Sequence, residues 1–78
     1  MHISIKMNER IETLRMNLEN QLEFIEGLLP DKHLINLDMV EEQLDQASFY
    51  VTDLMALNQD TKKYESKINK LKESYGIK

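Results

Sequence analysis

Apolar residues recur every three or four positions along most of the chain, which is the spacing of an amphipathic helix. In the first third, Gln21 occupies the one position of this row where an apolar residue is missing. Leu22 and Leu29 lie beside the row and widen it. The pattern predicts a helix from about residue 7 to about residue 29. The members of the row are Met7, Ile11, Leu14, Leu18, Ile25 and Leu28.

A bend is predicted over residues 30–36. Gly27 weakens the end of the first helix, and Pro30 disfavours the α conformation of the residue before it. Asn36 or Asp38 supplies an N-cap for the next helix. Three apolar residues of this stretch are unusual for a solvated loop, and we expect them to fold over the end of the helix pair: Leu34, Ile35 and Leu37.

A second apolar row predicts a helix over about residues 37–57. It comprises Leu37, Val40, Leu44, Ala47, Val51 and Leu54. The row resumes after a step of three residues where four are due, at Leu57, Thr61, Tyr64, Ile68, Leu71 and Tyr75. Such a slip either overwinds a continuous helix or marks a break. Gly76 is a good terminator, so the last helix should end near residue 75.

The predicted fold is therefore all-α and forms a single domain over residues 1–78, with two alternatives for its second half. Either three helices form a bundle, or one long helix runs from about residue 37 to 75. The absence of glycine and proline in residues 58–63 favours the long helix. Its second half would then lack a partner within the chain, so we expect a dimeric helical bundle.

The residues expected to form the self-association seam are those at the centres of the apolar rows. They are Ile11, Leu14, Leu18, Ile25, Val40, Leu44, Val51, Leu54, Ile68 and Leu71. A chain of 78 residues buries only about 60% of its unfolded surface, and it has no cysteine for a disulfide. Oligomerisation is the remaining common stabiliser of so small a domain.

Composition indicates a folded protein of the cytoplasm. Hydrophobic residues make up 41% of the chain, which is too many for a disordered tail, and nowhere do 18 apolar residues follow one another. The first seven residues do not resemble a secretory signal. Abundant lysine, isoleucine and asparagine hint at an AT-rich genome, such as that of a low-GC bacterium or its phage.

Charge is divided unequally along the chain. Residues 1–61 carry twelve acidic and four basic residues, whereas residues 62–78 carry six lysines and two glutamates. This polarity suits pairing of an acidic with a basic segment, within one chain or between two. Lys63, Lys67 and Lys70 share a helical face and form a candidate partner surface. Contact of these lysines with nucleic acid is a weaker alternative, because the whole protein is acidic.

No set of residues predicts catalysis, a metal site or a cofactor. His2 and His33 lack a carboxylate at metal-ligand spacing on an assured helix. The acidic residues around Glu41 and Asp45 are explained by their position near a helix N-terminus. The serines have no histidine at helical spacing to act as a base. We therefore expect a protein that is not an enzyme.

Two segments resemble a known family. "IETLRMNL" at residues 11–18, followed after a bend by "VEEQLDQ" at residues 40–46, resembles the small two-helix aspartyl-phosphate phosphatases that act on sporulation response regulators. That family carries Ser-Gln-Glu-Leu-Asp on its second helix. Leu44 and Asp45 match the motif, and Gln43 stands in place of its glutamate. The resemblance implies an accessory modulator of a phosphorylated regulator, with Asp45 important for activity.

The pattern as a whole favours a different function. We expect a non-enzymatic helical module that self-associates and acts as a regulator, inhibitor or assembly factor by binding another protein. The modulator of a phosphorylated regulator and the nucleic-acid contact remain the alternatives.

Overall fold

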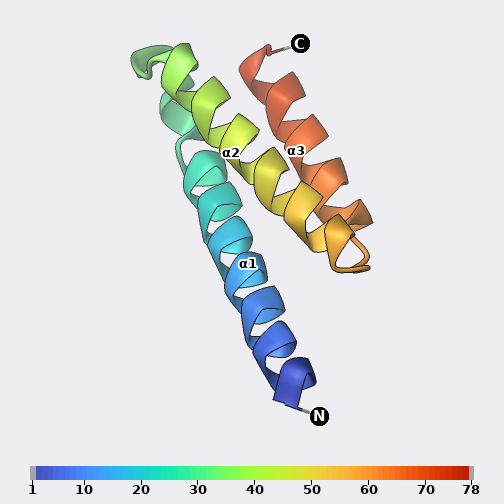
Figure 1. Ribbon diagram of the computed structural model, residues 1–78. Helices are drawn as coiled ribbons and strands as arrows, with labels where there is room; N and C mark the ends of the chain where they lie inside the picture. Colours follow the sequence, from blue (N-terminus) through green and yellow to red (C-terminus); the bar gives the residue numbers. More distant parts are fainter. Residues whose placement is uncertain (1, 78) are drawn as a thin grey trace.

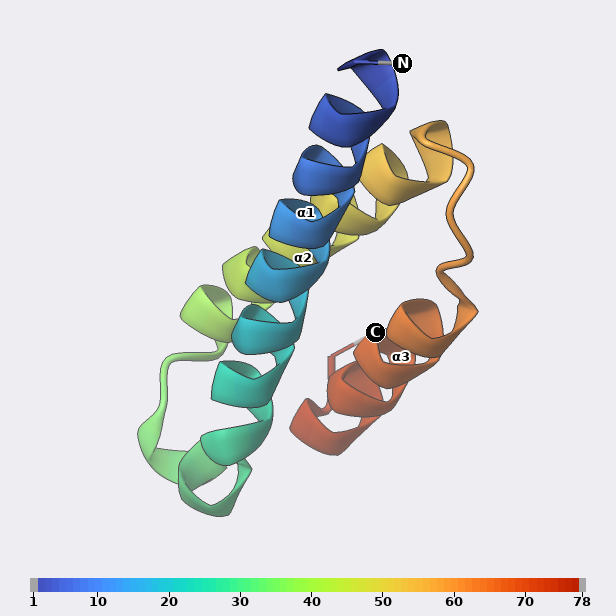
Figure 2. The same ribbon diagram turned by 90° about the horizontal axis from the view of Figure 1, so that it is seen from below.

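Three helices and a short 3₁₀ helix make up the fold (Figure 1). The computed structural model describes residues 2–77. Helix α1 spans His2–Gly27, the 3₁₀ helix η1 spans Leu29–Leu34, α2 spans Leu37–Ala56 and α3 spans Lys62–Tyr75. The first turns of α1 extend past the connection between α2 and α3 (Figure 1). Helix α3 packs against one side of the α1–α2 pair (Figure 2).

The core follows the apolar rows of the sequence. All ten residues of the expected self-association seam are buried within this single chain. The complete core consists of Ile11, Leu14, Leu18, Leu22, Ile25, Val40, Leu44, Ala47, Val51, Leu54, Tyr64, Ile68, Leu71 and Tyr75. The predicted burial of the seam is confirmed, and its role between two chains stays a prediction. A second copy would have to bind elsewhere while this fold is intact.

The bend forms where it was predicted, but it is not closed in the predicted way. Asn36 is the N-cap of α2, and its Oδ1 accepts a hydrogen bond of 2.9 Å from the backbone N–H of Asp38. Ile35 packs against the core. Leu34 is 87% exposed and Leu37 is 45% exposed, so the expectation that they fold over the end of the helices is wrong. Leu34 is the last residue of η1, and no residue of η1 is buried.

The favoured continuous helix over residues 37–75 is also wrong, and the three-helix alternative is confirmed. Helix α2 ends in a Schellman motif, a C-terminal cap that needs one residue in the left-handed conformation. That residue is Asn58, with φ 61°. The N–H groups of Asn58 and Gln59 donate to the carbonyls of Met55 and Leu54, at 2.9 and 3.0 Å. Gly76 ends α3 in the same way, with φ 75°.

The fold-back gives the apolar stripe of α3 a partner within the chain. Tyr64, Ile68, Leu71 and Tyr75 lie three or four residues apart and are all at most 5% exposed. The far end of the bundle is tied as well, because Lys32 Nζ in η1 donates to the carbonyl oxygen of Ser74, at 3.0 Å. A dimer is therefore not required to cover α3.

The conformation of Asn58 leads to a stability prediction. Replacing Asn58 with alanine should lower the free energy of unfolding by about 1 kcal/mol, because a Cβ without a polar side chain disfavours the left-handed conformation. Asn58→Gly should leave it nearly unchanged or raise it. Urea denaturation followed by circular dichroism measures both. Equal stability of the two variants would show that residue 58 is not held in this conformation.

Candidate interaction surfaces

The groove between α1 and α3 is lined by opposite charges. Glu19 and Glu23 of α1 face Lys63 and Lys67 of α3. Lys67 Nζ lies 3.3 Å from Glu26 Oε1, and Lys63 Nζ lies 4.0 Å from Glu19 Oε2. Two of the three lysines of the predicted partner surface, Lys63 and Lys67, therefore lie beside carboxylates of the same chain. Lys70 lines the same groove farther along.

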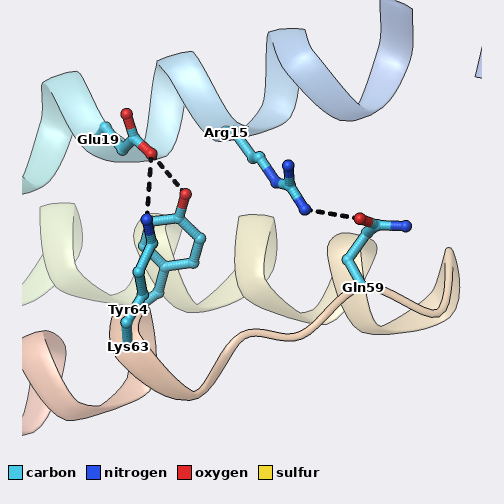
Figure 3. Close-up of polar contacts among 5 residues, drawn as sticks. All are labelled: Arg15, Glu19, Gln59, Lys63 and Tyr64. Carbon is cyan, nitrogen blue, oxygen red and sulfur yellow. Dashed lines mark hydrogen bonds and ion pairs between the residues drawn. The ribbon is translucent and has the colours of Figure 1, made fainter. Parts of the chain in front are cut away.

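Two tyrosine hydroxyls fix α3 on α1. Tyr64 donates to Glu19 Oε2 at 2.5 Å, and Tyr75 donates to the carbonyl oxygen of Ile25 at 2.6 Å. Figure 3 shows Tyr64 and Lys63 meeting Glu19 from one side, while Arg15 reaches Gln59 in the α2–α3 connection. The Arg15 Nη2 to Gln59 Oε1 distance is 2.6 Å. Burial, the hydrogen bond to Glu19 and the charge of Glu19 together raise the pKa of Tyr64 to about 12.

Between α1 and α2 lies a hollow without any charged side chain. It is lined by Asn17, Asn20, Gln21 and Phe24 of α1 and by Gln43 and Tyr50 of α2, which we call the amide face. The groove between α2 and α3, by contrast, includes Glu65 and Lys72. In a chain with 31% charged residues, a lining of four amides and two aromatic rings is distinctive.

Side chains of the amide face are linked to one another. The Nε2 group of Gln21 donates to Gln43 Oε1 at 2.8 Å and to Gln46 Oε1 at 3.1 Å. Gln21 Oε1 is buried and has no hydrogen-bond partner among the described residues. A buried polar atom without a partner destabilises a fold by roughly 1–3 kcal/mol. The face therefore retains an amide where an apolar residue would continue the row.

Phe24 gives the amide face an exposed aromatic ring. Its side chain is 55% exposed, and the half-buried Tyr50 lines the same hollow. Phe49 is 70% exposed but does not line the hollow. The two phenylalanines are therefore a matched pair, one inside and one outside the same candidate surface.

Other candidates from the sequence do not gather into a site. Asp45, central to the phosphatase resemblance, lies exposed on α2. Within residues 6–77, whose side chains the structure describes, no three His, Cys, Asp or Glu side chains are close enough together to hold a metal ion. None of the described helices combines the length and apolar character of a membrane span.

Comparison with known proteins identified no matching family model, curated protein or solved structure.

Sequence reasoning missed the amide face, although its signal is present. Asn17 and Phe24 are seven residues apart, as are Gln43 and Tyr50. Residues at this spacing share one stripe of a helix. Uncharged polar residues next to an apolar row do not stand out until the packing of α1 on α2 brings the two stripes together.

The raised pKa of Tyr64 predicts a loss of stability at high pH. Since the folded state holds this proton more tightly than the unfolded chain, whose tyrosines have a pKa near 10.0, the stabilisation is complete below pH 10. It should be lost as the pH rises from about 10 to about 12. Tyrosinate absorbance and circular dichroism report the titration and the unfolding. In the Tyr64→Phe variant, the tyrosinate absorbance should lose one tyrosine that ionises well above pH 10. If the absorbance titration is unchanged, the raised pKa does not belong to Tyr64.

Gln21 provides a second stability prediction. Replacing Gln21 with leucine should raise the free energy of unfolding by about 1 kcal/mol, because it removes an unpartnered buried oxygen and completes the apolar row. Chemical denaturation measures the change. The control is Gln46→Leu, which removes an acceptor of Gln21 without removing that oxygen and should give no such gain. A less stable Gln21→Leu variant would show that the two amide hydrogen bonds outweigh the buried oxygen.

Proposed function

We propose that this protein is a non-enzymatic α-helical interaction module, which binds a partner protein through the amide face and acts as a regulator, inhibitor or assembly factor in the cytoplasm. The observation that carries the proposal is the absence of charge across six lining residues that include an exposed phenylalanine.

Interface chemistry supports this choice of surface. The centres of protein–protein interfaces are depleted in charged residues and enriched in aromatic ones, because buried charges lose hydration that a partner seldom replaces. Phe24 is exposed enough to insert into a partner, and Tyr50 is half-buried in the lining of the same hollow. The amides at Asn17 and Asn20 are exposed and are able both to donate and to accept hydrogen bonds.

The stability cost at Gln21 supports a role for the same surface. Residues kept for function are often less favourable for stability than the alternatives. An unpartnered amide oxygen inside the row between Leu18 and Ile25 fits that description. A purely structural helix would gain from an apolar residue at this position.

The alternatives have weaker support. Nucleic-acid contact would draw on Lys63, Lys67 and Lys70, but Lys63 and Lys67 lie close to Glu19 and Glu26. Carboxylates beside the lysines reduce the attraction for phosphates. Modulation of a phosphorylated regulator depends on Asp45, which is exposed on α2, and only Leu44 and Asp45 match the motif of that family. More observations support protein binding through the amide face than support either alternative.

The test is differential capture of partners by matched baits. Wild-type protein, Phe24→Asp and Phe49→Asp are immobilised and exposed to a lysate of the organism that encodes the chain, and retained proteins are identified by mass spectrometry. Phe24→Asp places a charge in the amide face, so the partner should be retained by wild type and Phe49→Asp but reduced at least about tenfold on Phe24→Asp.

Circular dichroism first establishes that both variants are folded, which their exposed positions favour. If every retained protein binds Phe24→Asp as well as wild type, the amide face is not the binding surface and the proposal fails. Turnover of a substrate by the purified chain would also overturn it.

A further inference from the structure

We propose that the partner of the amide face is a second copy of this chain, giving a two-fold symmetric dimer in which the two α1–α2 pairs pack face to face. This inference rests on the proposed function, because it names the protein that the same surface binds.

Charge is the first reason. Each chain carries a net charge of −4, so two copies repel one another unless their contact keeps like charges apart. In a two-fold interface the same patch is used by both copies, and a residue near the axis faces its own counterpart. Charged residues there would face like charges. The amide face contains none.

Hydrogen-bonding chemistry is the second reason. A primary amide has both a donor and an acceptor, so an asparagine or glutamine complements its own copy across a two-fold axis. A carboxylate only accepts, and an ammonium group only donates. Asn17 and Asn20 are exposed beside Phe24, whose ring can also stack on its own copy. Every residue type lining the face is thus compatible with itself.

The charged groove between α1 and α3 is the competing surface for a second copy. Its acidic α1 wall could oppose the basic α3 wall of another chain. These charges already have partners within the chain, at Lys67–Glu26 and Lys63–Glu19, and burying them would remove hydration. The amide face requires no such desolvation of charge.

The experiment measures molar mass by sedimentation equilibrium on the full chain, at protein concentrations up to about 100 μM, where a dimer with a Kd of about 1 μM is mainly formed. Wild type and Phe49→Asp should have twice the mass of one chain. Phe24→Asp should raise Kd at least about a hundredfold, so that at about 10 μM chain the variant is mainly monomeric while wild type is still mainly dimeric. Asn17→Glu changes a second exposed position of the face, one that does not line the α1–α3 groove, and should weaken the dimer in the same direction.

Salt and a variant of the competing surface distinguish the two grooves. A dimer through the uncharged amide face should keep or increase its dimeric fraction when ionic strength rises, whereas one through the α1–α3 groove should dissociate. Lys70→Glu lies in the charged groove and should leave the proposed dimer intact. Because the chain has no cysteine, a single cysteine can be placed at Asn17 in the face or at Gln46, which accepts a hydrogen bond from Gln21 at its border, and at least one of the two variants should form an intermolecular disulfide.

A monomeric wild type overturns the inference, and so does a dimer that survives both Phe24→Asp and Asn17→Glu. Loss of the dimer in Lys70→Glu or Phe49→Asp would assign it to another surface. The two experiments give separable results. If wild type is monomeric but the Phe24→Asp bait no longer captures the partner that wild type captures, the proposed function stands and the dimer fails. If wild type is dimeric but no captured protein depends on Phe24, only self-association stands.

Discussion

Covering the apolar stripe of α3 is the constraint on which the rest of the structure depends. A 14-residue helix is marginal alone in water, and this one carries four large side chains on a single side. The α1–α2 pair buries them. The two tyrosines bring hydroxyls into the contact, and each donates to α1, at Glu19 and at the carbonyl of Ile25. Two directional contacts at opposite ends of α3 set both its position and its orientation.

That placement decides where charge lies on the molecule. The lysines of α3 come to lie against the glutamates of α1, so the unequal charge of the sequence is partly balanced inside one chain. Exposed pairs such as Lys67–Glu26 add little stability, and their main effect is on the character of the groove. The hollow between α1 and α2 is left with the amide face, whose six lining residues carry no charge.

The sequence predicts a residue's role when that role depends only on the helix that contains the residue, and not when it depends on a second element. Burial of the rows followed from spacing alone, because a residue on the apolar side of a helix is buried by whichever helix covers it. Gly76 was recognised as a stop, whereas Asn58 was not, since asparagine adopts the left-handed conformation less often than glycine. Leu34 was misjudged because its direction depends on η1. The amide face joins two helices, so neither helix pattern revealed it.

The three-helix fold also makes folding of one chain independent of self-association. An extended second helix would have needed a dimer to bury its last twenty residues or so, making folding and assembly a single event. Here the core closes within one chain, and a second copy would bind a surface that is already formed. Binding to the folded state alone adds stability that grows with protein concentration, without being a condition for folding. Recognition can then respond to concentration and to competing partners, because the monomer does not unfold when it separates.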